Sequence, residues 1–220
     1  MVTIGVDRAR GRMARAAGEA AARGFDALIV APSPDLVYLT GYAPMPLERP
    51  TLLVLVQDHA PVLVVPELER LLASEAPGAP AVDLVGWPDG MDPYATTAGL
   101  LPDRGRVAVG DRLWASHLLA LQAAAPGVEF RSGAEVLGRV RSVKDPDEID
   151  ALRRAGAAAD RTFEDVCALP FAGRREREVA DDLARLLVEH GHERADFTIV
   201  ASGPNAASPH HEPGDRVIDA

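Results

Sequence analysis

The chain has 220 residues, of which 47% are hydrophobic and 25% charged, and its formal net charge is −10. These fractions are typical of a soluble globular protein, and the acidic balance argues against the basic face that nucleic acid or an anionic membrane would need. We therefore expect no nucleic acid and no membrane as partner. The Arg-rich first 24 residues contain no continuous apolar run, which predicts neither a signal peptide nor a membrane span and favours a cytoplasmic protein.

The first 132 residues alternate between strand-like and helix-like patterns. Strands are predicted at 26–32, 51–57, 61–66, 81–87, 106–110 and 128–132, and helices at 7–23, 67–76, 92–101 and 114–125, with a short helical turn between Ser33 and Gly41. The alternation predicts a layered α/β domain with a mixed sheet, in which 51–57 and 61–66 form an antiparallel hairpin. We expect residues 1–132 to fold on their own.

From about residue 134 the pattern becomes mostly helical. Asp145 is predicted to cap a helix that has Pro146 at its first position and Glu148 at its third. A second helix is predicted from 175 to Gly191. Both helices are expected to bury an apolar stripe, and Cys167 is expected in the core; the stripe comprises Ile149, Leu152, Phe163 and Val166 on the first helix and Leu183, Leu186 and Leu187 on the second. Strands are predicted at 197–203 and from Val217.

Histidines are the main candidates for chemistry. His190 and His192 lie where a helix ends, which favours a structural role near the negative end of the helix dipole, and His59 and His117 are expected to be structural or on the surface. The pair His210-His211 follows the turn Gly203-Pro204-Asn205. A histidine on such a loop can move protons near neutral pH, so a functional and a structural role both stay open here. Asn205 is the only asparagine of the chain and Lys144 its only lysine.

Two segments resemble the creatinase/prolidase/aminopeptidase P family, peptidase M24, whose catalytic domain has a pita-bread fold. The first is the helix start that holds Arg141, Lys144, Glu148, Ile149, Leu152, Arg153 and Ala155, and the second is 197–218 with its histidine turn. YLTGY at 38–42 and the runs 48–56 and 63–69 are similar to the family's N-terminal domain. The resemblance implies a creatinase-like N-terminal α/β domain with a mixed sheet, residues 1–135, followed by a partial α+β pita-bread domain, residues 136–220.

The function implied by the resemblance is that of a Xaa-Pro metallopeptidase, of the prolidase or aminopeptidase P type, which hydrolyses proline-containing peptides. His210 matches the family's substrate-side histidine, which binds substrate or transfers a proton, whereas His211 lies where the family varies. The full-length protein would use two divalent ions, manganese, zinc or cobalt, held by two aspartates, a histidine and two glutamates downstream of that histidine. Asp215 and Asp219 do not match those positions, so the 220-residue chain is expected to bind no metal and to be inactive.

Two alternatives stay open. A creatinase-like amidinohydrolase would use the same histidine as acid and base without a metal. A non-catalytic dimerisation or protein-binding module is the alternative from another class. A homodimer is expected, because N-terminal domains of the family often support dimers.

Overall fold

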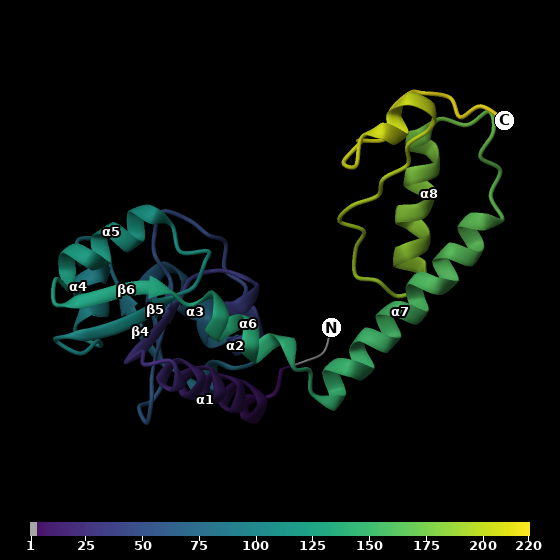
Figure 1. Ribbon diagram of the computed structural model, residues 1–220. Coiled ribbons are helices and arrows are strands. Elements are labelled where there is room, and N and C mark those ends of the chain that lie inside the picture. Colours follow the sequence, from purple (N-terminus) through teal and green to yellow (C-terminus); the bar gives the residue numbers. More distant parts are fainter. Residues whose placement is uncertain (1–3) are drawn as a thin grey trace. The chain divides into compact units, whose positions relative to one another are not determined.

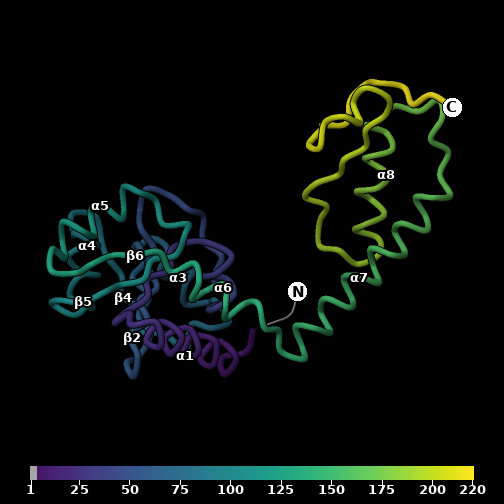
Figure 2. The backbone as a smooth tube through the Cα atoms, in the orientation of Figure 1, coloured from purple at the N-terminus to yellow at the C-terminus, as the bar shows by residue number. Residues whose placement is uncertain are grey.

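The computed structural model describes residues 4–220 and divides into two compact units, which meet in sequence between Val143 and Lys144. We refer to them as the N-terminal unit and the C-terminal unit. Figure 1 shows the elements of both units, and Figure 2 follows the backbone of the chain in the same orientation.

A six-stranded mixed sheet forms the centre of the N-terminal unit. Its strands are β1 (Ala27–Val30), β2 (Leu52–Val56), β3 (Val62–Pro66), β4 (Asp83–Trp87), β5 (Gly105–Val109) and β6 (Val128–Ser132). Their order across the sheet is β4-β3-β2-β1-β5-β6. The pairs β1–β2 and β2–β3 are antiparallel, and the other three pairs are parallel. The predicted hairpin is confirmed, with Leu53 opposite Leu63.

Helices cover both faces of this sheet (Figure 1). They are α1 (Val6–Ala22), α2 (Pro34–Thr40), α3 (Arg70–Ser74), α4 (Pro93–Ala98), α5 (Ala115–Ala124) and α6 (Ala134–Ser142), with short 3-10 turns at Glu67–Glu69 and Ala79–Ala81. One face packs against α1, α2, α3 and α6, and the other against α4 and α5. Because both faces are covered, β1 is buried at every position and reads as the continuous apolar run ALIV.

Helix α6 belongs to the N-terminal unit. Its side chains Val136, Leu137 and Val140 are buried in the same core cluster as α1, and the Arg141 guanidinium pairs with Asp35 of α2 at 2.8 Å. The boundary expected at residues 135/136 therefore falls inside α6, whereas the units of the structure divide after Val143. The reason is that α6 completes the cover of one sheet face.

The C-terminal unit contains two long helices, α7 (Pro146–Cys167) and α8 (Glu176–Glu189), and a 3-10 turn at Gly203–Ala207. None of the helices among the described residues combines the length and the apolarity needed to cross a membrane. Helices α7 and α8 pack together: Ala158 and Thr162 are buried on α7, and Val179, Ala180 and Leu186 on α8.

The predicted apolar stripe on α7 is wrong in part. Leu152 is 58% exposed and Phe163 is 70% exposed, and Ile149 is also exposed. Cys167, expected in the core, is exposed as well. The buried face of α7 instead consists of the small residues Ala158 and Thr162, which allow α8 to approach closely. The Thr162 hydroxyl donates a hydrogen bond to Ala158 O at 3.0 Å and is thus satisfied inside the helix.

The strands predicted at 197–203 and from Val217 do not form a ladder. Residues 197–202 have no regular secondary structure, and the described part of the tail shows one isolated bridge, between Arg175 and Val217. A β pattern specifies a strand only where a partner strand supplies hydrogen bonds. Val217 is bridged to Arg175, in the short segment that precedes α8.

Candidate functional site

One buried carboxylate organises the C-terminal unit. Glu176, the first residue of α8, has no exposed surface. Its Oε1 accepts hydrogen bonds from the Ser202 backbone N (2.7 Å), the Ser202 hydroxyl (2.9 Å) and Asn205 Nδ2 (3.1 Å). Its Oε2 accepts from Asn205 Nδ2 (3.0 Å), His211 Nε2 (2.8 Å) and, at 3.5 Å, the Gly214 backbone N. We call Glu176, Ser202, Asn205 and His211 the Glu176 cluster.

The chain after the histidine pair runs beside the start of α8. Glu176 N donates to Arg216 O at 3.0 Å and Arg177 N donates to Gly214 O at 3.1 Å, so tail carbonyls satisfy N–H groups that a helix start leaves without intrahelical partners. On the other side, Ile218 N donates to Arg174 O and Gly173 N to Ile218 O, both at 2.9 Å. These bonds fix the tail against the residues that lead into α8.

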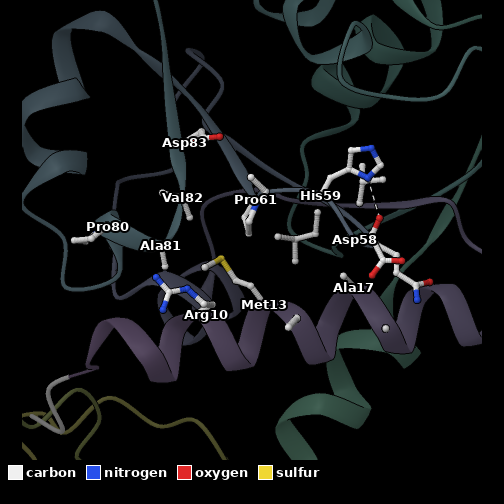
Figure 3. A pocket seen from close by; sticks show the side chains of 16 residues that line it. Arg10, Met13, Ala17, Asp58, His59, Pro61, Pro80, Ala81, Val82 and Asp83 are labelled. Atoms are coloured by element: carbon white, nitrogen blue, oxygen red, sulfur yellow. Dashed lines mark hydrogen bonds between the residues drawn. The ribbon is translucent and has the colours of Figure 1, made fainter.

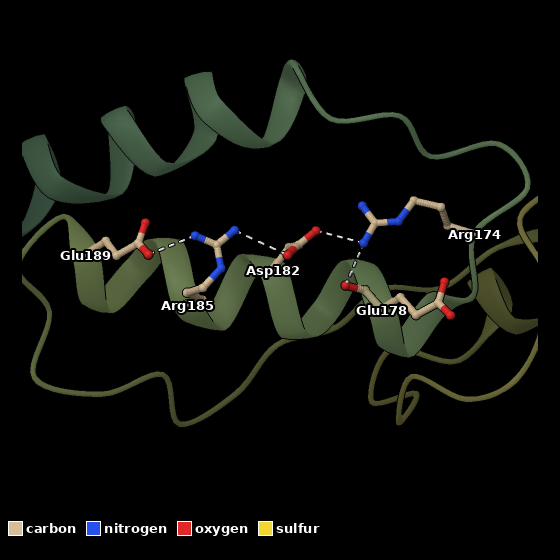
Figure 4. A network of polar contacts seen from close by, with 5 residues as sticks. All are labelled: Arg174, Glu178, Asp182, Arg185 and Glu189. Carbon is tan, nitrogen blue, oxygen red and sulfur yellow. Dashed lines mark hydrogen bonds and ion pairs between the residues drawn. The ribbon is translucent and has the colours of Figure 1, made fainter.

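A chain of ion pairs holds the segment that leads into α8 (Figure 4). Arg174 donates to the Asp182 carboxylate at 2.7 Å and to Glu178 O at 3.1 Å, and Arg185 links Asp182 to Glu189. Hydrogen bonds from Arg174 and Arg185 lower the pKa of Asp182. Since Arg174 O also accepts from Ile218, the network supports the position of the tail.

The Glu176 cluster keeps its carboxylate charged. Burial by itself would raise the pKa of Glu176, but hydrogen bonds from His211, Ser202 and Asn205 outweigh it and lower the pKa to about 2. The positive end of the α8 dipole acts in the same direction, because Glu176 occupies the first turn. An ionised carboxylate only accepts hydrogen bonds, so His211 Nε2 carries the proton in its bond to Glu176.

The two histidines of the predicted turn have different surroundings. His211 is bound to Glu176, and its side chain is 20% exposed. His210 is exposed, and its ring lies 6.0 Å from the Phe197 ring, centroid to centroid, with the planes tilted by 53°. The Glu176 cluster thus binds the loop on both sides of His210 and leaves the His210 imidazole at the surface.

Gly203 allows this loop to turn. Its φ of +51° lies in the left-handed region, and an added Cβ would reach the Arg216 guanidinium. The turn Gly203-Pro204-Asn205 therefore brings the Asn205 amide back to Glu176.

Three of the other histidines, His190, His117 and His59, have structural contacts. His190 caps the C-terminal end of α8, and its Nε2 lies 2.6 Å from the Asp165 carboxylate of α7. In the N-terminal unit His117 is buried: its Nδ1 lies 2.8 Å from the Tyr94 hydroxyl, and its ring stacks on Trp114 at 5.4 Å. His59 Nδ1 contacts Gln57 O in the β2–β3 turn.

The N-terminal unit contains a cavity of about 560 Å³ between α1, the β2–β3 turn and the start of β4 (Figure 3). Met13 and Ala17 line it from α1, and Asp58 and His59 lie on the turn. Its titratable side chains are exposed, and Arg10 is paired with Asp7 at 3.0 Å. Exposed groups keep their hydration, so this cavity lacks the buried charge that distinguishes the Glu176 cluster.

Among residues 4–220, no group of three or more His, Cys, Asp or Glu side chains has an arrangement that could hold a metal ion.

Glu176 was not predicted from the sequence. It lies in the acidic and basic run REREVADD, where a carboxylate is ordinarily on a solvated helix face. The signals that pointed to the cluster were the histidine pair and Asn205, the only asparagine of the chain. Its amide donates to both oxygens of Glu176, a geometry that a carboxylate in its place could not provide.

Comparison with known proteins covers both units. The Creatinase/Prolidase N-terminal domain matches residues 12–143, and Metallopeptidase family M24 matches residues 150–220. The chain belongs to metallopeptidase family M24. The family and the fold expected from the residues are therefore confirmed, with a creatinase-like N-terminal domain followed by part of an M24 catalytic domain.

Several of the similar proteins are named as dipeptidases. The chain is 41% identical over 209 residues to the probable dipeptidase PepE of Mycobacterium tuberculosis, covering 94% of this chain and 56% of that protein. The crystal structure of dipeptidase PepE from Mycobacterium ulcerans is similar with a TM-score of 0.93 and 38% identity, over 99% of this chain and 59% of that one. The crystal structure of a dipeptidase from Pyrococcus horikoshii has a TM-score of 0.80 and 28% identity over 94% of this chain and 58% of that one. The chain thus spans little more than half the length of these relatives.

Proposed function

We propose that the whole protein is a metal-dependent dipeptidase of the Xaa-Pro type. The observation that carries this proposal is the 41% identity to a probable dipeptidase over 94% of the chain, across both units. Prolidases are also among the similar structures, including one from Thermococcus sibiricus at 28% identity. Hydrolysis of short peptides that contain proline is therefore the activity to test first.

In this proposal His210 is the substrate-side residue. Its imidazole is exposed on a loop that the Glu176 cluster binds on both sides. An imidazole near neutral pH can donate a hydrogen bond to a peptide carbonyl or transfer a proton at the scissile amide. A loop held by a buried charge keeps such a group in one place, which is what proton transfer requires.

The metals belong to the same proposal. We propose that two divalent ions, manganese, zinc or cobalt, activate water in the whole protein and that their ligands lie downstream of His210. The 220-residue chain alone is then expected to be inactive. Hydrolysis of a Xaa-Pro dipeptide by the purified chain, abolished by a chelator, would refute that expectation.

The test of the function uses the protein at its full natural length. Hydrolysis of Ala-Pro and Ala-Ala is measured with added manganese, zinc or cobalt, and creatine is included as the substrate of the alternative amidinohydrolase. The proposal expects hydrolysis of Ala-Pro that His210→Ala lowers by about 10²-fold or more, the usual range for a lost acid–base group. Turnover of creatine without metal would favour the alternative, and no turnover of any of these would favour a binding module.

Cytoplasmic location and a homodimer also stay proposals. Light scattering after size exclusion tests the second, with an expected mass of twice that of one chain.

A further inference from the structure

The loop that carries His210 is bound to one carboxylate from both sides. Ser202 and Asn205 precede His210 and donate to Glu176 at 2.7–3.1 Å. His211 follows His210 and donates at 2.8 Å. Glu176 itself comes from α8, 26 to 35 positions earlier in the sequence. The loop is therefore fixed to a helix rather than only to its own neighbours.

An ionised carboxylate is the group that these donors need. Its two oxygens offer about four lone-pair sites and no hydrogen, and the cluster presents a backbone N–H, a hydroxyl, an amide and an imidazole N–H. A glutamine of the same shape would keep one acceptor oxygen but would direct an NH₂ group at donors. The donors of the cluster thus require the negative charge of Glu176 and not only a side chain of its size.

Burial makes this arrangement specific. A charged group without solvent is stable only where hydrogen bonds replace its hydration. A shift of the loop would take these donors away from the Glu176 carboxylate, which has no exposed surface in this arrangement. The free energy of the buried charge therefore disfavours alternative loop conformations and holds His210 in one of them.

We propose that Glu176 is a positioning residue for His210. It does not touch substrate; it acts through Ser202, Asn205 and His211 on the place and orientation of the His210 imidazole. The inference rests on the proposed function for its catalytic consequence, but its structural part, the fixing of the loop, can be tested without any activity.

The structural part is tested in the 220-residue chain by amide hydrogen exchange. The Ser202 and Gly214 amides donate to Glu176, so their protection reports directly on the cluster. Glu176→Gln is expected to remove the protection of both amides while the amides of α7 stay protected. Glu178→Gln is the matched control, because Glu178 is on the same helix, is exposed, and accepts from Arg175 N outside the cluster. Unchanged protection of Ser202 and Gly214 in Glu176→Gln would overturn the inference whatever the enzyme does.

The catalytic part is tested in the protein at full natural length. Glu176→Gln is expected to lower kcat/KM for Ala-Pro by about 10²-fold, the cost of misplacing a reacting group by about 1 Å, at temperatures where exchange shows α7 and α8 folded. In the His210→Ala background the same substitution is expected to add almost nothing, because the effect passes through His210. A role in stability alone predicts instead that the two effects multiply.

The hydrogen bond from His211 to Glu176 supplies a second, independent test. His211→Gln keeps an N–H donor for Glu176 and is expected to retain most of the activity, whereas His211→Leu removes the donor and is expected to lose activity as Glu176→Gln does. Equal activity of the two His211 variants would contradict the proposed role of this hydrogen bond. If the wild-type protein hydrolyses no peptide, the proposed function fails, and the exchange experiment alone decides whether Glu176 fixes the loop.

Discussion

The start of α7 gives a prediction whose size can be worked out from the structure. Asp145 accepts a hydrogen bond from Glu148 N at 2.9 Å, and the Glu148 carboxylate accepts from Asp145 N at 2.8 Å. Pro146 follows at the first helical position. This is a complete capping box, and Asp145→Ala removes the side chain on which it depends.

The expected cost is about 1 kcal/mol of unfolding free energy, within a range of about 0.5–2 kcal/mol for the loss of an Asp N-cap. The C-terminal unit, Lys144–Ala220, falls in the size range in which 1 kcal/mol lowers the melting temperature by about 4–8 °C. Asp145→Asn is expected to retain most of the stability, because asparagine caps about as well as aspartate.

The assay is thermal unfolding followed by NMR signals of α7 and, separately, of the central sheet. Asp150→Ala is the matched control: the same substitution on the same helix removes an exposed pair with Arg153, which contributes about 0–1 kcal/mol. The reasoning is refuted if Asp145→Ala and Asp150→Ala shift the α7 transition equally, or if Asp145→Asn is as damaging as Asp145→Ala.

Three further outcomes follow from the surroundings of single residues. The pKa of Glu176 is lowered from 4.5 to about 2. Its contribution to stability is therefore complete above pH 4.5 and is lost as the pH falls through about 2. Acid unfolding followed by circular dichroism should show this loss, and the Glu176→Gln variant should not show it. Burial and the neighbouring Glu69 carboxylate raise the pKa of Tyr42 from 10 to about 12. The stability that depends on the neutral phenol is therefore complete below pH 10 and is lost as the pH rises through about 12. Phenolate absorbance should show a late titration step, and Tyr42→Phe should abolish that step. Gly78→Ala should lower the free energy of unfolding in urea by about 1–3 kcal/mol, because the added Cβ would collide with the Thr40 carbonyl. Gly138→Ala is the control: its Cβ, on the exposed face of α6, meets no atom within 4 Å, so the substitution should be neutral or stabilising.

The N-terminal unit could be predicted well because its signals are local. The hairpin 51–66 has two apolar runs separated by a short turn, and α2 has a serine cap at Ser33 and a glycine at Gly41 with φ +74°. In such segments the side chains that decide the structure are neighbours in the sequence. The motif KDPDE was likewise informative for two reasons at once: it carried the family resemblance, and it forms the capping box of α7.

The C-terminal unit was predicted less well because its structure depends on distant residues. Glu176 and His211 are 35 positions apart, and no local pattern distinguishes a buried acid on α8 from its solvated neighbours. The pattern of 197–203 is that of a strand, but no described segment pairs with it in a ladder. The stripe on α7 failed for a related reason, since the helical period shows that one face is apolar and not that a partner covers it.

The extent of the first folding unit is a final prediction, and it differs from the expectation that residues 1–132 fold on their own. Cutting after 132 removes α6 and with it three buried side chains, Val136, Leu137 and Val140. At about 1.5–3 kcal/mol for each large apolar side chain, the loss is comparable with the about 5–15 kcal/mol by which a whole domain is stable. It would also leave part of the face of α1 exposed, since α1 and α6 share that core cluster.

We therefore expect residues 1–143 to unfold cooperatively in urea as an independent domain and residues 1–132 to be unfolded or to lose most of that stability. A third polypeptide, 1–143 with Val136→Ala and Val140→Ala, separates the packing of α6 from the length of the chain. It should fall between the other two, because the helix remains but two of its buried contacts are reduced. If residues 1–132 unfold at the same urea concentration as residues 1–143, then α6 adds no stability to the sheet, and the division of the chain after Val143 has no energetic basis.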